Sequence, residues 1–219
     1  MRSIRVVSTL LITSLGLAGC STVNPYTGEQ QTAKATTGTA IGAAAGALVG
    51  VLSSSKHDRG KGALIGAAAG AAVGGGVGYY MDQQEAKLRQ QMQGTGVSVT
   101  RQGDQILLNM PNSITFDSSS SQLKPAGANA LTGVAQVLKE YPETQVNVVG
   151  HTDSTGGREM NMRLSQQRAE SVGSALILQG VAQGRISMAG VGPDQPVASN
   201  ETVEGRAQNR RVTLTLSAQ

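Results

Sequence analysis

Residues 145–168 decide the fold of the C-terminal half of the chain and read QVNVVGHTDSTGGREMNMRLSQQR. The first seven of them alternate β-branched apolar side chains with polar ones, which predicts a strand over 145–151. Apolar residues recur at helical spacing from about residue 161 to residue 179, which predicts a helix. The loop between the two elements follows the carboxyl end of a strand, where open α/β sheets usually bind ligands.

Asp153 lies in this loop, and three polar side chains share one stripe of the predicted helix. Asn161, Ser165 and Arg168 are spaced i, i+4 and i+7, so they point to the same side of the helix. A carboxylate pairs well with an ammonium, and the planar guanidinium of arginine fits a carboxylate with two hydrogen bonds. Asp153 and Arg168 together predict a site for a group that carries both an ammonium and a carboxylate.

Turn residues and apolar periodicity place the other elements of this half. They are expected at residues 97–101 (strand), 105–110 (strand), 125–141 (helix), 186–189 (strand) and 211–216 (strand). Gly103 and Asp104 are typical of a tight hairpin turn, Pro125 opens the helix and Pro142 follows its end. The order β-β-α-β-α-β-β predicts an α/β (α+β) domain, a mixed sheet with its helices on one face.

Four motifs in this half occur together in one known family. They are Gly-His-Thr-Asp at 150–153, Asn161, Leu-Ser-Gln-Gln-Arg at 164–168 and Asn-Arg-Arg at 209–211. In this order and spacing, residues 94–219 resemble the OmpA-like peptidoglycan-binding domain. The resemblance implies that the ligand is diaminopimelate, the cross-linking residue of Gram-negative peptidoglycan. It also implies that Asp153 takes the ammonium of diaminopimelate and Arg168 takes the carboxylate.

The same resemblance points to supporting contacts at Asn161, Thr155, Arg210 and Ser119. Many members of the family carry Asn at the position of Ser119. Two neighbouring arginines are expected to have other roles: Arg211 alternates with Val212 into the last strand and points outward, and Arg206 caps a helix-like segment over residues 202–207.

The start of the chain is typical of a bacterial lipoprotein. Arg2 and Arg5 precede an apolar run over residues 6–17, which is too short to span a membrane comfortably. Leu-Ala-Gly-Cys at 17–20 resembles a lipobox, and Cys20 is the only cysteine of the chain. We expect a signal peptide over 1–19, acylation of Cys20, and a polar tether over 20–37. Because Ser21 is not the Asp that signals inner-membrane retention, the expected location is the outer membrane, with the domain facing the periplasm.

The middle of the chain contains an internal repeat. Residues 38–50 and 62–74 share a pattern in which glycine recurs at every fourth position. This spacing puts the glycines on one helical face, so that two helix backbones can approach closely. We expect a glycine-zipper helical hairpin over 38–80 with a charged turn. Three roles stay open: a hairpin that dips into or spans the membrane, a hairpin that self-associates at the membrane surface, or a flexible Gly/Ala-rich spacer.

A glycine-free stretch of strong helix formers follows the repeat. Asp82 is a good N-cap and Gly94 a good stop signal, which predicts a separate helical linker over 81–93. With the polar tether, this linker would act as a spacer between the anchor and a wall-facing domain.

Composition argues against several other functions. The formal net charge of +4, the absence of Trp and the single Phe give no basic, aromatic surface for nucleic acid. His57 and His151 are the only histidines and cannot build a convincing zinc site. Neither a nucleophile elbow nor a catalytic carboxylate pair is evident, so no catalytic residue, metal or cofactor is expected.

The sequence thus predicts a binding protein rather than an enzyme. It resembles outer-membrane lipoproteins that join a lipobox, a glycine zipper and an OmpA-like domain. Such a protein would bind peptidoglycan non-covalently through the stem-peptide diaminopimelate and link the outer membrane to the cell wall. The alternative is an envelope assembly or stress protein, in which the glycine-zipper membrane segment is the active part.

Overall fold

The computed structural model describes residues 21–23, 30–32, 34–53 and 59–219. The predicted signal peptide and Cys20 lie outside these residues, as does most of the polar turn between the two glycine repeats. The elements are β1 (Ser21–Val23), β2 (Gln30–Thr32), α1 (Lys34–Ser53), α2 (Arg59–Met92), β3 (Ser98–Gln102), β4 (Gln105–Pro111), α3 (Asn112–Thr115), α4 (Pro125–Glu140), β5 (Thr144–His151), α5 (Arg158–Leu178), the 3-10 helix η1 (Gln183–Arg185), β6 (Ile186–Gly192), α6 (Val203–Asn209) and β7 (Arg211–Ala218). β1 and β2 form a short antiparallel pair.

The main sheet has five strands in the order β3-β4-β7-β5-β6 and is mixed, as predicted. β5 and β6 are parallel, and every other neighbouring pair is antiparallel. The parallel pair needs a long crossover connection, which α5 supplies. Because β5 has a strand on each side, the loop after it starts from the interior of the sheet rather than from its edge.

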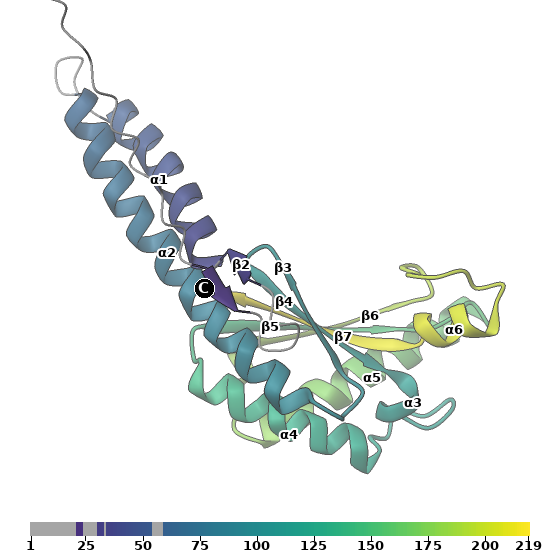
Figure 1. Cartoon of the computed structure of the whole chain (residues 1–219). Coiled ribbons are helices and arrows are strands. Elements are labelled where there is room, and N and C mark those ends of the chain that lie inside the picture. The colour runs from purple at the N-terminus through teal and green to yellow at the C-terminus, as the bar shows by residue number, and fades with distance from the viewer. Residues whose placement is uncertain (1–20, 24–29, 33, 54–58) are drawn as a thin grey trace, which may run out of the picture.

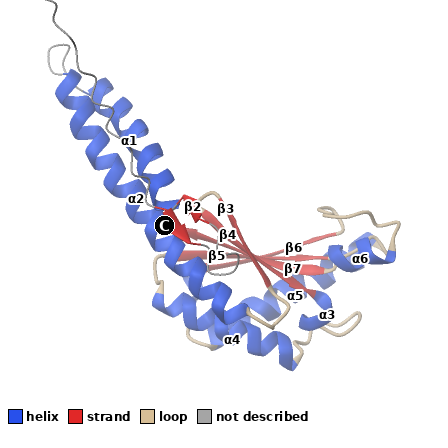
Figure 2. Ribbon diagram, in the orientation of Figure 1, coloured by secondary structure: helices blue, strands red, loops and turns tan. Residues whose placement is uncertain are grey.

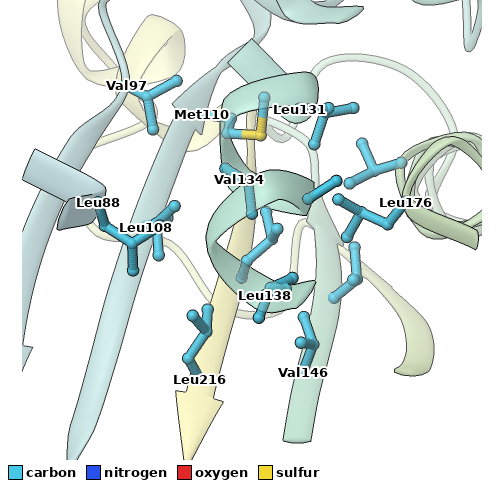
Figure 3. Close-up of a cluster of buried hydrophobic side chains, with 14 of the residues drawn as sticks. Leu88, Val97, Leu108, Met110, Leu131, Val134, Leu138, Val146, Leu176 and Leu216 are labelled. Carbon is cyan, nitrogen blue, oxygen red and sulfur yellow. The ribbon is translucent and has the colours of Figure 1, made fainter. Parts of the chain in front are cut away.

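The helices cover one face of the sheet, as Figures 1 and 2 show for α4, α5 and the lower end of α2. Residues of β4 alternate accordingly: Ile106, Leu108 and Met110 are buried, and the residues between them are less so. Figure 3 shows the core between the sheet and α4, with Leu88 of α2 and Leu176 of α5 reaching it from the flanking helices. This packing holds α5, which carries the predicted polar stripe, in a fixed place on the sheet.

The expected break between the glycine hairpin and a separate linker helix does not exist. α2 runs without interruption from Arg59 to Met92, so Asp82 lies inside the helix and is not an N-cap. Met81, Leu88 and Met92 are buried in the domain core, and Gln84 is buried beside Thr144, whose Oγ1 lies 3.2 Å from Gln84 Oε1. The prediction failed because α2 packs against a neighbour along its whole length. Its glycines pack against α1, and the larger residues from Met81 onward pack into the domain core. This tertiary packing outweighs the local capping signal of Asp82.

The glycine repeat does form a helical hairpin, in which α1 packs along the first half of α2 (Figure 1). A Cβ atom on Gly46 of α1 would lie 2.0 Å from the carbonyl oxygen of Gly66 and 3.0 Å from the Cα of Gly70. Only hydrogen fits in that space, so the two backbones touch where the four-residue spacing predicted it.

Candidate functional site

Two glycines allow α5 to lie directly on β5 and β6. A Cβ atom on Gly150 would be 2.0 Å from the carbonyl oxygen of Ser165, and one on Gly190 would be 2.2 Å from the backbone nitrogen of Gln166. Ser165 Oγ accepts a hydrogen bond from the backbone of Gly192 at 2.9 Å, and Gln166 Oε1 accepts one from Gly190 at 2.7 Å. Ser165, on the predicted polar stripe, is therefore a buried link between the helix and the sheet.

Asp153 follows β5 and is almost completely buried, with 7% of its surface exposed. Its Oδ2 lies 2.6 Å from Nη1 of Arg210, and its Oδ1 accepts a hydrogen bond from the backbone of Thr155 at 2.9 Å. Burial alone would raise the pKa of Asp153, but the hydrogen bonds from Arg210 and Thr155 outweigh burial and lower that pKa. The carboxylate is therefore charged at neutral pH in a site that excludes most water.

Asn161 shapes the loop that holds this carboxylate. Its Nδ2 donates to the carbonyl of Thr155 at 2.9 Å and to that of Asp153 at 3.4 Å. Asn161 comes from the first turns of α5, so the helix fixes the loop backbone on both sides of the carboxylate. The asparagine thus orients Asp153 through main-chain contacts.

Arg168 lies two turns farther along α5 and is 2% exposed. Its Nε donates to the carbonyl of Ser120 at 2.9 Å, and its guanidinium carbon lies 5.2 Å from the centre of the Phe116 ring. Burial and the nearby charge of Arg210 lower the pKa of Arg168 to about 10, so the guanidinium is still cationic at neutral pH. One edge of the guanidinium is thus held by the protein.

Ser119 belongs to the loop between α3 and α4, on the other side of the pocket. It is the one non-glycine residue with a positive φ, 55°, among the described part of the chain. Asn tolerates this left-handed conformation better than most side chains, which fits the Asn that the family resemblance leads us to expect at this position. Ser119 adopts the same conformation at the pocket wall.

These residues line a single cavity of about 580 Å³. All six binding residues predicted from the sequence are among those that form its wall, which are Asn112, Ser118, Ser119, Thr152, Asp153, Thr155, Gly156, Met160, Asn161, Arg163, Leu164, Gln167, Arg168, Arg206 and Arg210. The wall includes four arginines and one carboxylate. It is therefore net positive, which favours a ligand that brings a negatively charged group to this wall.

Two wall residues that the sequence analysis missed have buried polar atoms without a partner in the described structure. They are Thr152, whose Oγ1 is unpaired, and Asn112, whose Oδ1 is unpaired. Thr152 stands between two residues that the motif singled out, so its place in the loop was visible in the sequence. Asn112 carries no sequence signal, because only the fold brings α3 to this wall.

Arg211 was predicted to point outward, and this is wrong. It is 7% exposed and donates to the carbonyl oxygens of Asn209 and Gln195, both at 3.2 Å. These two main-chain acceptors, in the loop after β6 and at the end of α6, draw the side chain inward, against the alternation of the strand. Arg206 was expected to cap the segment over residues 202–207. Its guanidinium instead donates hydrogen bonds to the carbonyls of Asn200 and Glu201, which hold the loop before α6 in place.

His151 is buried at the end of β5 and is not part of the cavity wall. Its Nε2 lies 3.2 Å from Thr213 Oγ1, and burial together with the charge of Arg211 lowers the pKa of His151 to about 4. The imidazole is therefore neutral at physiological pH. Within the described residues, no group of three or more His, Cys, Asp or Glu side chains could hold a metal ion.

Comparison with known proteins agrees with this architecture. Residues 115–210 match the OmpA family, and residues 1–82 match the YMGG-like Gly-zipper family. The chain is 66% identical to the probable lipoprotein YiaD of Escherichia coli over 216 residues, which cover 99% of the chain and 98% of that protein.

Two further similarities concern the C-terminal half. The peptidoglycan-binding protein ArfA of Mycobacterium tuberculosis is 42% identical over 104 residues, which cover 48% of the chain and 32% of ArfA. The solved cell wall anchor of the type VI secretion system from Pseudomonas aeruginosa superposes with a TM-score of 0.56 at 29% identity, over 62% of the chain and 97% of that structure. The chain therefore belongs to the OmpA family, and within it to the YiaD-like lipoproteins that join a YMGG-like Gly-zipper to an OmpA domain.

Proposed function

We propose that this lipoprotein binds peptidoglycan non-covalently by gripping the zwitterionic end of a stem-peptide diaminopimelate. The observation that carries the proposal is a buried, charged Asp153 and a buried, cationic Arg168 in the wall of one cavity. Both charges are desolvated before any ligand arrives, so little further desolvation of the protein opposes binding. Asp153 takes the ammonium group, and Arg168 takes the carboxylate.

Arg210 has a second part in this account. Its guanidinium pairs with Asp153, so an incoming ammonium competes with it for the same carboxylate. Arg210 is partly exposed, with 37% of its side chain accessible, and so has room to turn toward the carboxylate of the ligand. Ser119, Thr155 and Asn161 also line the wall, and Asn161 holds the loop that carries Asp153 and Thr155.

Relatives support peptidoglycan as the partner. ArfA is named for peptidoglycan binding, and the type VI secretion neighbour is described as a cell wall anchor. The YiaD relative is named a probable lipoprotein. We infer from the lipobox-like sequence that Cys20 is acylated, that the acyl chains hold the protein in the outer membrane, and that the domain faces the periplasm. The protein would thus link the outer membrane to the wall.

Co-sedimentation of the purified protein with insoluble peptidoglycan tests the proposal. Free diaminopimelate should release the protein from the pellet. Asp153→Ala and Arg168→Ala should each weaken binding by about 2 kcal/mol, or roughly thirtyfold, because each removes a charge-assisted contact. Arg158→Ala is the matched control, since Arg158 forms an exposed ion pair with Asp194 outside the cavity. Equal sedimentation of all the variants would rule out this site.

The exposed apolar surface of the α1–α2 hairpin favours a second candidate, an envelope assembly protein in which the hairpin is the active part. A lipid anchor fused directly to the wall-binding domain distinguishes the two. The fusion should begin at Val77, because Tyr80 and Met81 pack into the domain. If wall attachment is the whole function, the fusion should restore it. If the assembly role holds, the fusion should bind the wall and yet fail to replace the protein.

A further inference from the structure

The α1–α2 hairpin exposes more large apolar side chains than the rest of the described chain. Between 61% and 85% of the surface of each of these side chains is accessible: Leu48, Val49, Leu52, Leu64, Ile65, Val73 and Tyr79. Soluble proteins rarely expose so many large apolar residues in one place, and such a surface usually contacts another protein or a membrane.

The apolar surface surrounds the hairpin and is not confined to one side. Neither residues 35–53 of α1 nor residues 62–81 of α2 include Asp, Glu, Lys or Arg. A helix that docks on one partner keeps a polar face toward water, whereas a helix that is apolar all round needs an apolar environment on every side. A second copy of the chain would cover one side of the hairpin, so a lipid bilayer fits the surface better.

The length of the uncharged segments also fits a bilayer. About 20 residues at a rise of 1.5 Å span roughly 30 Å, the thickness of the hydrocarbon core. α2 contains the one helix among the described residues that is long and apolar enough to cross a membrane, over Lys61–Met92, and its most apolar stretch is almost entirely exposed. It is therefore unlike the buried core helix of a soluble protein.

Polar groups mark both ends of this segment. Tyr79, which is exposed, precedes Asp82 at the end next to the domain, and Arg59 and Lys61 lie at the far tip of the hairpin. Tyrosines favour the membrane–water interface, and long cationic side chains reach the headgroups. The backbone polar groups along the segment are paired within the two helices, as hydrocarbon requires, and the close contact at Gly46 needs no polar side chain.

We propose that the α1–α2 hairpin inserts into a lipid bilayer with its charged tip leading, as a membrane attachment separate from Cys20. Because α2 continues without a break into the domain core, where Met81 and Leu88 are fully buried, the inserted hairpin holds the domain at a fixed distance from the membrane. Figure 1 shows the hairpin projecting from the domain as a rod. This inference stands independently of the peptidoglycan proposal.

The absence of tryptophan from the chain makes a direct depth measurement possible. A chain that begins at Ser21 keeps every element that the structure describes and lacks both the apolar leader and Cys20. Single-tryptophan variants Val73→Trp, Tyr79→Trp and Leu178→Trp would be mixed with phosphatidylethanolamine–phosphatidylglycerol vesicles that contain lipids brominated at known depths. Leu178 is 87% exposed on the wall-binding domain and is the matched control.

Insertion predicts that bromines near the bilayer centre quench Val73→Trp most, that bromines near the headgroups quench Tyr79→Trp most, and that none quenches Leu178→Trp. Val73→Lys, which puts a charge in mid-span, should lower vesicle binding about a hundredfold, whereas Leu178→Lys should leave it unchanged. The proposal is overturned if Val73→Trp is not quenched at any depth. It is also overturned if the chain stays in solution as an oligomer whose formation Val73→Lys abolishes.

Discussion

Asp153 and Arg210, 57 residues apart in the chain, form an ion pair in the wall of the cavity, with 2.6 Å between Oδ2 and Nη1. The pair joins the loop after β5 to the start of β7, two strands that are neighbours in the sheet. The buried carboxylate therefore has a cationic partner even without a ligand. In the proposed mode of binding, a ligand ammonium exchanges for that partner, so binding would depend on both residues.

Replacing Arg210 should change the titration of Asp153. Burial raises the pKa of Asp153 and the Arg210 hydrogen bond lowers it, so Arg210→Ala should move the pKa upward. The carboxyl resonance of Asp153, followed by NMR against pH, measures the shift. Arg206→Ala is the control, because Arg206 also lines the cavity but donates its hydrogen bonds to the main-chain carbonyls of Asn200 and Glu201. An unchanged titration in Arg210→Ala would contradict the electrostatic account of the site.

The close contact between α5 and β5 predicts a stability effect at Gly150. A Cβ atom there would lie 2.0 Å from a backbone oxygen, which cannot move without shifting α5, so Gly150→Ala should cost about 3 kcal/mol or more. Gly184→Ala is the control, since its Cβ would meet nothing within 4 Å and its φ is not in the left-handed region. Urea unfolding of the two variants should give clearly different midpoints, and similar midpoints would show that α5 does not pack as described.

His151 should make stability depend on pH between about 6.5 and 4. Its folded pKa is lowered to about 4 from 6.5, so over this range the unfolded chain binds a proton that the folded chain does not. The stabilisation is complete above pH 6.5 and decreases as the pH falls toward 4, by on the order of 3 kcal/mol in total. Unfolding free energies of the wild type and His151→Gln, measured at pH 7 and pH 4.5, should differ in slope. Parallel pH profiles would contradict this assignment.

Two glycines of the hairpin should respond to alanine with opposite signs. Alanine is favoured over glycine in a helix by about 1 kcal/mol, so Gly76→Ala, where a Cβ meets nothing within 4 Å, should raise thermal stability. Gly46→Ala puts a methyl group 2.0 Å from the carbonyl oxygen of Gly66 and should lower it. Thermal unfolding of the two variants, followed by the helical circular dichroism signal, measures the difference in stability. A gain in both variants would mean that α1 and α2 do not touch at Gly46.

The strand and helix around Asp153 could be predicted from sequence because local signals and tertiary packing agree there. Apolar alternation marked β5, helical spacing marked α5, and the spacing of Asn161 and Arg168 put both side chains on the pocket side. The prediction failed at Asp82, where a good capping residue lies inside a continuous helix that packs against α1 in its first half and against the domain in its second.

The rest of the site depends on contacts between distant segments. Arg211 turns inward because the carbonyls of Gln195, in the loop before α6, and of Asn209, at the end of α6, accept its hydrogen bonds, which strand alternation does not encode. Asn112 reaches the cavity only because α3 lies next to the residue before β7. The backbone nitrogen of Asn112 donates a hydrogen bond to the carbonyl of Arg210 at 3.0 Å. Neither contact leaves a pattern in the local sequence.

The most direct test of the central claim is a titration of the protein with two stem peptides that differ at one residue. One contains diaminopimelate, and the other contains lysine in its place, which keeps the side-chain ammonium and lacks the neighbouring carboxylate. If Arg168 binds that carboxylate, calorimetry should show the lysine peptide binding at least about thirtyfold more weakly, and Arg168→Ala should remove the difference. Equal affinity for the two peptides would contradict recognition of a zwitterionic group at this site.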